Sequence, residues 1–320
     1  MTRRLLLLLP ATLAGCAGLQ SALDPRGPAA AEIARLSWVM FGGATLVTML
    51  VTVLLLRALM RSRPRPVSER LFIIAGGIIL PVVTLTALLA WSHRIGNRIE
   101  AMPDDRLVVE VTGLMWWWQF RYLDANGDAI TANELHLPVG RPVELRLQSA
   151  DVIHTFWIPN LAGKRDLIPG KTNRLMMQAG RAGVFRGQCN EFCGDQHALM
   201  AMLVIAQPPS EFDRWLERQR QPARLPESEP ERRGHQAFMQ AGCADCHRIR
   251  GTAANGDTAP DLTHFGSRRT IAAATLNNSY GNLQAWIASA QHIKPENRMP
   301  DFPLDGPTLH ALATYLGSLE

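Results

Sequence analysis

Two long apolar segments without a charged residue constrain the fold of this chain more than any other feature. They span residues 37–56 and 71–91. Each has about 20 residues, which as a helix rising about 1.5 Å per residue is long enough to cross roughly 30 Å of hydrocarbon. A buried helix in a soluble protein rarely remains uncharged over such a length. We therefore predict a transmembrane hairpin over residues 37–95.

Basic residues between the two segments predict their orientation. The arginines there are Arg57, Arg61, Arg63, Arg65 and Arg70. Glu69 is the acidic residue among them. Basic loops stay in the cytoplasm, so both ends of the hairpin are expected on the outer face. Such arginines and a formal net charge of +5 could also indicate nucleic-acid binding. A cluster confined between two spans is better explained by membrane topology, so we predict no nucleic-acid partner.

The N-terminus reads as a secretory signal. A basic pair precedes the apolar run Leu5–Leu9, which is too short to cross a bilayer. The following Leu13-Ala14-Gly15-Cys16 resembles the bacterial lipobox, in which cleavage before the cysteine frees a thiol that carries diacylglycerol. We predict a lipoprotein signal peptide over residues 1–15, lipidation of Cys16 and an extracytoplasmic segment over residues 16–36. The alternative is an ordinary signal peptide with an incidental cysteine.

From residue 107 the pattern changes to short alternating apolar runs. The runs predicted to be strands are Leu107–Val111, Trp116–Tyr122, Glu134–Val139, Val143–Gln148, Val152–Ile158, Asn173–Gln178, Val184–Gln188 and Met200–Ala206. Turn residues such as Gly140 and Pro169-Gly170 separate them. Short strands at this spacing indicate a Greek-key sandwich or barrel. We place this domain at residues 96–207.

Metal-binding side chains gather near the end of this region. Cys189, Cys193, His197 and Met200 fall within one loop, and His154 lies upstream in a strand-like run. Sulfur with imidazole selects copper, zinc or iron–sulfur, and structural zinc makes little use of methionine. A mononuclear blue-copper site needs one cysteine, so the second thiolate allows both sulfurs to bridge two copper ions. A disulfide between the two cysteines is the alternative, but it leaves His197 and Met200 unexplained.

A second cysteine pair forms the motif Cys243-Ala244-Asp245-Cys246-His247. C-x-x-C-H is typical of covalent c-type haem attachment, with the histidine as an iron ligand. A methionine as second axial ligand raises the potential, and we predict Met299 for this role. Met239 is the competing candidate, but it falls in the helix that precedes the haem cysteines. Ligation by His264 or His292 is a further alternative, although both are expected on the surface.

Helices are predicted in the last third of the chain. Their ranges are Ser210–Gln221, Arg232–Ala241, Asn282–Ala290 and Pro307–Leu319. Residues 221–230 are polar and rich in proline, which is typical of a tether between domains. We therefore predict a helix and a proline-rich linker over residues 208–230. An all-α cytochrome c domain is predicted over residues 231–320.

The loop of metal-binding residues has the form C-x-E-x-C-x-x-x-H-x-x-M. It resembles the copper-A loop of cytochrome c oxidase subunit II. The aromatic run at 116–122 and the segments 134–140, 151–154 and 163–170 also fit, so the resemblance covers roughly residues 30–207. With the haem motif after it, the chain resembles the bacterial caa-type form. The resemblance implies a two-helix transmembrane hairpin, a cupredoxin-like Greek-key β-barrel and a cytochrome c domain.

The resemblance also implies roles for single residues. The copper-A ligands would be His154, Cys189, Glu191, Cys193, His197 and Met200, with Glu191 binding through its backbone carbonyl. The carboxylate of Glu191 would face a magnesium or manganese ion shared with subunit I. Trp116 would receive electrons from cytochrome c. Glu69 lies near the position of a glutamate that feeds a proton channel, but its distance along the chain from Pro81 departs from the family pattern.

The function implied is that of subunit II in a proton-pumping haem–copper oxidase of the bacterial plasma membrane. Electrons would come from an external cytochrome c or an upstream quinol–cytochrome c reductase. They would pass through haem c and copper A to subunit I, where oxygen is reduced to water, and subunit III would be a further partner. Both redox domains would lie on the outer face. The alternative is a stand-alone membrane-anchored electron-transfer protein that serves another reductase.

Overall fold

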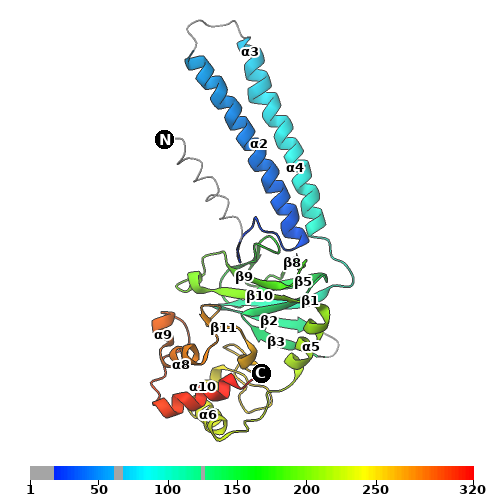
Figure 1. Cartoon of the computed structure of the whole chain (residues 1–320). Coiled ribbons are helices and arrows are strands. Elements are labelled where there is room, and N and C mark those ends of the chain that lie inside the picture. Colours follow the sequence, from blue (N-terminus) through cyan, green and yellow to red (C-terminus); the bar gives the residue numbers. More distant parts are fainter. Residues whose placement is uncertain (1–17, 61–67, 124–126) are drawn as a thin grey trace, which may run out of the picture.

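The computed structural model describes residues 18–60, 68–123 and 127–320, and it divides into three parts (Figure 1). A pair of long helices comes first, a β-sandwich follows, and a helical domain ends the chain. The predicted signal peptide, the predicted lipidation site Cys16 and the arginines at 61, 63 and 65 lie outside the described residues.

Within the described residues, two helical segments are long and apolar enough to cross a membrane. The first is α2 (Pro28–Leu59), and the second joins α3 (Glu69–Phe72), the π-helical turn η2 (Ile73–Ile79) and α4 (Leu80–Ile99). Their apolar side chains are open to the surroundings: Leu46 is 69% and Leu85 is 65% exposed. Helix α2 begins at Pro28, inside the segment predicted to be extracytoplasmic, because proline is well suited to the first helical position.

The segment before α2 is bound to the β-sandwich by its backbone. The amide of Arg26 donates to the Asn160 carbonyl at 2.7 Å, and its carbonyl accepts from the Gly180 amide at 2.7 Å. A Cβ atom at Gly27 would lie 2.3 Å from the Gln178 carbonyl oxygen, so only glycine fits this close approach. These contacts fix the start of the membrane helix on the extramembrane domain.

The middle domain consists of two five-stranded sheets that pack face to face. Its strands are β1 (Leu107–Leu114), β2 (Trp117–Leu123), β3 (Ala129–Ala132), β4 (Glu134–Pro138), β5 (Val143–Ser149), β6 (His154–Trp157), β7 (Arg165–Leu167), β8 (Asn173–Met177), β9 (Gly183–Cys189) and β10 (Ala201–Gln207). The sheet orders are β3-β2-β1-β5-β8 and β4-β10-β9-β6-β7. The pairs β1–β5 and β10–β4 are parallel, and the other pairs are antiparallel. This is the predicted Greek-key class, with β3 and β7 as short additional strands.

Alternating burial along the strands forms the sandwich core. In β1 the side chains of Val109 and Val111 are fully buried, while Glu110 between them is not. Each large apolar side chain removed from water contributes roughly 1.5–3 kcal/mol. Helix α5 (Pro209–Arg220) adds Phe212 and Trp215 to the same core. It begins at Pro209, one residue before the predicted start at Ser210, because proline suits the first helical position.

The C-terminal domain is mainly helical. Its elements are α6 (Glu229–Gln240), α7 (Cys243–Cys246), the 3-10 turn η4 (Phe265–Ser267), β11 (Thr270–Ile271), β12 (Leu276–Asn277), α8 (Tyr280–Ala288), α9 (Ala290–Ile293) and α10 (Gly306–Gly317). Helices α6 and α10 cross closely at Gly234, where a Cβ atom would lie 2.1 Å from the Ala311 carbonyl oxygen. Between β11 and β12, Ala272, Ala273 and Ala274 all have positive φ angles, so they form a left-handed turn.

The predicted tether is not free but bound to the C-terminal domain. The amide of Ala223 donates to the Arg250 carbonyl at 2.9 Å, and Nε of Arg224 donates to the Ser318 carbonyl at 2.8 Å. The capping box of Ser228 and Glu231 then starts α6, three residues before the predicted Arg232. Backbone hydrogen bonds of this kind have no signature in composition, so the sequence alone indicated only a proline-rich tether.

Candidate copper and haem sites

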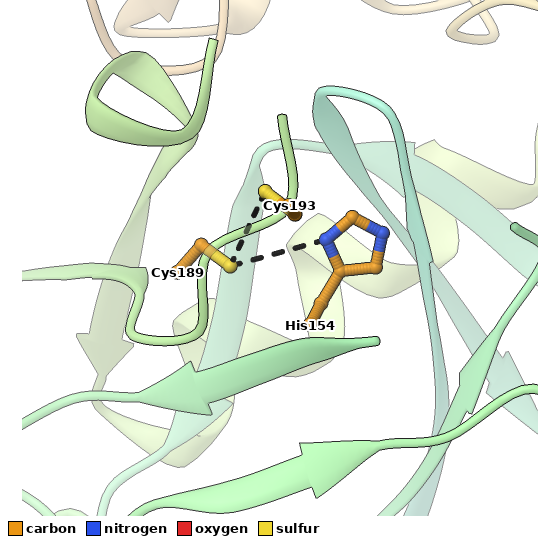
Figure 2. Close-up of side chains that lie close together, drawn as sticks. All are labelled: His154, Cys189 and Cys193. Carbon is orange, nitrogen blue, oxygen red and sulfur yellow. Dashed lines mark hydrogen bonds between the residues drawn. The ribbon is translucent and has the colours of Figure 1, made fainter. Parts of the chain in front are cut away.

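Adjoining strands and one loop bring the predicted copper ligands together. His154 begins β6 and Cys189 ends β9, and these two strands are paired in the same sheet. The loop of residues 189–200, here called the copper loop, adds Cys193, His197 and Met200. Figure 2 shows that His154, Cys189 and Cys193 point toward one another. The strand pairing explains how a histidine distant in sequence reaches the loop.

The ligand atoms converge on one point. Sγ of Cys189 lies 3.7 Å from Sγ of Cys193 and 3.9 Å from Nδ1 of His154 (Figure 2). On the other side, Sγ of Cys193 lies 3.6 Å from Nδ1 of His197 and 3.8 Å from Sδ of Met200. A disulfide would hold the two sulfurs about 2.05 Å apart, so both cysteines are free. The disulfide alternative does not describe this structure.

Surrounding groups orient and activate these ligands. Nε2 of His154 bonds to Asp151 at 2.8 Å, which turns Nδ1 toward the sulfurs. Burial opposes protonation of His154, but its bonds to Cys189 and Asp151 prevail and raise the pKa of the imidazole. The contact with Cys193 lowers the pKa of Cys189 to about 3. A thiol that ionises this readily offers the thiolate that metals bind.

The donor set fits copper. Two thiols, two imidazoles and a thioether converge, and the carbonyl oxygen of Glu191 lies 3.2 Å from Sγ of Cys189. His154, Cys189 and Met200 are almost fully buried, which suits a metal shielded from solvent. This combination of soft sulfur and imidazole matches copper better than structural zinc. The side chain of Glu191 is exposed, so its carboxylate is available at the surface.

Trp116 connects the copper loop with a large cavity. Its Nε1 donates to the carbonyl of Cys193 at 2.8 Å. Its ring lies against Gly194, where a Cβ atom would be 3.0 Å from the ring edge. The same tryptophan lines a cavity of about 610 Å³, and so do Trp117 and Asn133 of the same domain.

The opposite side of this cavity carries the haem motif. The cavity is lined by Cys243, Cys246, His247 and Met299. We call it the haem cavity. Nδ1 of His247 donates to the Pro260 carbonyl at 2.7 Å, which leaves Nε2 for a ligand. These residues fit a covalently attached haem with histidine and methionine ligands.

The lining of the haem cavity distinguishes the two candidate methionines, and it also contains a cation, Arg268. Met299 lines the haem cavity, whereas Met239 is not among its lining residues and packs against the core of the domain. Arg268 also lines the cavity, and its buried Nε has no hydrogen-bond partner among the described residues. A guanidinium group with a free donor suits an anionic substituent of the bound group. No motif marked Arg268 in the sequence.

The remaining predicted residues lie apart from both sites. His292 is exposed, as expected. His264 is not on the surface but 5% exposed, because its ring nitrogens face the carbonyl oxygens of Gln221 and Glu320 at 3.0 Å each. It therefore ties the linker to the C-terminus. Glu69 is exposed at the start of α3.

Comparison with known proteins identifies both extramembrane domains. Residues 129–207 match the family described as "Cytochrome C oxidase subunit II, periplasmic domain". Residues 231–320 match the family described as "Cytochrome c". The first match implies a copper centre and the second implies haem c, in agreement with the donor sets described above.

Similar proteins extend the likeness over the whole chain. A protein of Alkalihalophilus pseudofirmus named "Cytochrome c oxidase subunit 2" is 33% identical, and the similarity covers 96% of this chain and 94% of that one. Its namesake in Bacillus subtilis is 33% identical over 76% of this chain and 70% of its own length. The solved periplasmic domain of subunit II of cytochrome oxidase from Bradyrhizobium japonicum is 32% identical and covers 37% of this chain and 96% of its own length, with a TM-score of 0.36.

The match to the Alkalihalophilus pseudofirmus protein includes the membrane part as well as both extramembrane domains. The apolar hairpin together with the family indicates a membrane-anchored protein with a periplasmic domain, associated with the other subunits of an oxidase. The haem motif and the second family match account for the last third of the chain. The chain therefore belongs to the cytochrome c oxidase subunit II family, in the form that carries a C-terminal cytochrome c domain.

Proposed function

We propose that the chain accepts electrons at a haem c in its C-terminal domain and passes them through a binuclear copper-A centre to subunit I of a haem–copper oxidase. One observation carries this proposal. Trp116 lines the haem cavity and also donates a hydrogen bond to the carbonyl of the copper ligand Cys193. The two sites thus share one aromatic side chain.

The copper pair would be held by His154, Cys189, Glu191, Cys193, His197 and Met200. Copper bound there would supply a one-electron relay. The chain contributes rigidity, because His154 and Cys189 lie on paired strands of a packed sheet. Asp151 holds the His154 ring in one orientation. Ligands that cannot move keep the reorganisation on electron transfer small.

Cys243, Cys246, His247 and Met299 would hold the haem. Haem bound there would supply the site that receives external electrons. The Pro260 carbonyl fixes the tautomer and direction of His247. Apolar side chains, including Leu262, Phe265, Trp286 and Phe302, line the cavity and keep water from it.

We assign Trp116 to the internal step between the two sites. The family resemblance implied that this residue receives electrons from a separate cytochrome c. Here it lines a cavity whose other side is formed by the chain's own haem motif. An external cytochrome c, or an upstream quinol–cytochrome c reductase, would then deliver to the C-terminal domain.

The proposed setting is the bacterial plasma membrane. The arginine-rich turn would lie in the cytoplasm and both redox domains outside, with Cys16 carrying lipid. Subunits I and III would be the partners, and subunit I would reduce oxygen and pump protons. The 76% exposed Phe192 beside the exposed carboxylate of Glu191 supports contact with another subunit there, including a shared magnesium or manganese ion.

The test is purification from membranes, followed by metal analysis and optical and EPR spectroscopy. We expect two copper ions per chain, a mixed-valence copper signal and a c-type haem band, all co-purifying with the haem of subunit I. A mononuclear blue-copper signal would overturn the proposal. Co-purification with a different reductase, without that haem, would favour the stand-alone electron-transfer protein instead.

Two variants test the role of Trp116. Trp116→Leu removes both the ring and the N–H donor, and we expect electron transfer from haem to copper to slow at least tenfold. Trp116→Phe keeps a ring but loses the bond to Cys193, so an intermediate rate is expected. Flash-induced reduction of the haem, followed at the copper absorption band, measures both rates. Equal rates in the wild type and both variants would remove Trp116 from the path.

A further inference from the structure

Lys294 lies in the interface between the two redox domains. It belongs to the C-terminal domain and follows α9, yet it is only 3% exposed. Its Nζ donates to the carbonyl of Leu199 at 3.0 Å and lies 3.4 Å from the carbonyl of Ala272. Leu199 is in the copper loop, next to the ligand Met200, and Ala272 is in the C-terminal domain. One ammonium group therefore joins backbone atoms of both domains.

The environment of this lysine is unusual for a buried cation. No carboxylate of the described residues forms an ion pair with Lys294, so two carbonyl oxygens are its partners. Burial of an ammonium group in an interface is costly. It lowers the pKa of Lys294 to about 8, while the charge of the nearby Cys193 sulfur acts in the opposite direction. Hydrogen bonds to the carbonyls of Leu199 and Ala272 offset part of the cost, so they favour this one arrangement of the two domains.

The acceptor Ala272 belongs to the left-handed turn that it forms with Ala273 and Ala274. Residues other than glycine rarely occupy this conformation in succession, so surrounding contacts must hold the turn. The carbonyl of Ala273 accepts from the amide of Ala201 at 3.3 Å, directly after Met200. The turn is thus held between the copper domain on one side and Lys294 on the other.

Further contacts surround this point. Nε2 of Gln196 in the copper loop donates to the carbonyl of Pro295, the neighbour of Lys294. Glu134 of β4 is 2% exposed and accepts from the amides of Arg269 and Thr270 at 2.8 and 2.9 Å. These bonds cross the interface on both sides of the turn.

We propose that Lys294 is an interdomain lock that seats the haem domain on the copper loop, so that the two domains act as one rigid unit. The lock consists of its ammonium group and the carbonyls of Leu199 and Ala272. It stands on the geometry of the interface alone. Its consequence for electron transfer rests on the proposed function.

Amide hydrogen exchange in the purified oxidase tests the lock without a redox readout. Lys294→Met keeps the length of the side chain but removes its donors and charge. We expect at least tenfold faster exchange at Ala201 and Thr270, whose amides bond across the interface, and unchanged exchange within α8 and α10. Lys171→Met removes an exposed lysine of the same domain as the copper loop and should leave all of these amides unchanged. Unchanged exchange at Ala201 in Lys294→Met would overturn the proposal.

Lys294→Met could also loosen the haem domain itself, which would be detected as faster amide exchange in α8. A second pair of variants tests the lock in that case. Lys294→Arg keeps charge and donors, whereas Lys294→Gln keeps only a shorter neutral amide. The lock requires slower exchange at Ala201 in the arginine variant than in the glutamine variant. Equal exchange in the two would refute it.

The rate of electron transfer from haem to copper separates the lock from the proposed function. If both hold, Lys294→Met slows the transfer at least tenfold and Lys294→Arg restores most of the rate. If exchange at Ala201 rises while the transfer rate stays constant, the lock stands and the proposed path through this interface fails.

Discussion

Asp151 illustrates how a residue that binds no metal can determine a metal site. One carboxylate oxygen bonds to Nε2 of His154, and the other accepts from the amide of Met115 at 2.7 Å. Met115 precedes Trp116 and also lines the haem cavity. The same aspartate thus orients His154, a predicted copper ligand, and anchors the backbone at Met115.

Loss of this carboxylate should weaken copper binding. For Asp151→Asn we expect a 10–100-fold lower copper affinity, because such carboxylates fix the direction and basicity of the ligating histidine. Competition with a copper chelator measures the affinity. Asp195→Asn, at an exposed position of the copper loop, is the control and should bind copper as the wild type does. Equal affinities in the two variants would contradict this role of Asp151.

Glu231 gives the C-terminal domain a pH-dependent contribution to stability. Burial acts against ionisation, but bonds from the Glu227 and Ser228 amides and from Arg224 prevail and lower its pKa from 4.5 to about 2. The ionised carboxylate therefore stabilises the fold above pH 4.5, and this contribution is lost as the pH falls toward 2.

We expect Glu231→Gln to lower the free energy of unfolding by about 1–2 kcal/mol at pH 7. The difference from wild type should shrink below pH 4.5, as both forms become neutral. Denaturant titrations at several pH values, followed by haem absorption, measure it. Glu229→Gln alters a neighbour that is 66% exposed and should have a much smaller effect. A difference that stays constant down to pH 2 would contradict the assignment.

At the scale of single residues, the copper loop stands out in the sequence because four side chains that suit copper lie within twelve positions of one another. The structure brings these side chains together, and their binding of copper stays a prediction. Their spacing alone restricts the chemistry. Arg268 and Lys294 could not be assigned in this way. Their hydrogen-bond partners are backbone carbonyls, and such contacts leave no spacing pattern in the sequence.

At the scale of elements, the crossing of α6 and α10 depends on Gly234. A Cβ atom there would lie 2.1 Å from the Ala311 carbonyl oxygen and 2.6 Å from Cβ of Tyr315. Both atoms belong to α10, and neither can move by a change of side-chain rotamer. A side chain at this position therefore cannot be accommodated. The two helices approach as closely as they do because this position has no side chain.

Gly234→Ala should therefore destabilise the domain by about 1–3 kcal/mol or more, despite the higher helix propensity of alanine. Gly281→Ala in α8 is the matched control, because a Cβ atom there meets nothing within 4 Å. It should leave stability unchanged or raise it by up to about 1 kcal/mol. Thermal unfolding followed at the haem band compares the two. Equal melting temperatures would refute the close packing of α6 on α10.

The predicted elements differ from the observed ones mainly where elements are short. Alternation of apolar residues identified a long strand such as β1, because one face of it is buried. β7 has three residues, and α7 and α9 have four each, too few for a period to be recognised. The π-helical turn η2 likewise has no separate sequence signal, although Pro81 follows it and lacks an amide donor.

At the scale of the whole molecule, the C-terminal domain covers part of the copper domain. Trp116 and Trp117 face the haem cavity, so removal of the domain would expose them. Helix α5 must be kept in any truncation, because Phe212 and Trp215 complete the sandwich core. A chain that ends at Gln221 keeps α5 and removes the C-terminal domain, so it exposes Trp116 and Trp117.

In an oxidase with this truncated chain, we expect an added soluble cytochrome c to reduce the copper centre directly. The rate should rise linearly with cytochrome concentration, since the step becomes bimolecular. In the full-length protein the haem should always be reduced before the copper. Stopped-flow absorption at the haem and copper bands follows both steps. Direct reduction of copper ahead of haem in the full-length protein would contradict the coverage of Trp116.

The composition of residues 221–230 led to the expectation of a proline-rich tether between domains. The described structure instead holds the linker through Ala223, Arg224 and His264, and it seats the domain through Glu134 and Lys294. The domain order and fold class were predictable, because they depend on hydrophobic patterning. Docking was not, since it depends on contacts between residues that are far apart in the chain.

The interface of Lys294, Glu134 and Ala201 has a consequence for the response to ionic strength. Each of these groups bonds to a backbone amide or carbonyl across the interface, and the three residues are almost fully buried. Dissolved ions screen exposed charges over about 10 Å at 0.1 M but scarcely affect buried hydrogen bonds. Added salt should therefore slow the encounter with an external donor while the internal transfer from haem to copper keeps its rate. Under the proposed function, fusion of the carrier to its acceptor would make this electron-transfer step independent of the surrounding salt concentration.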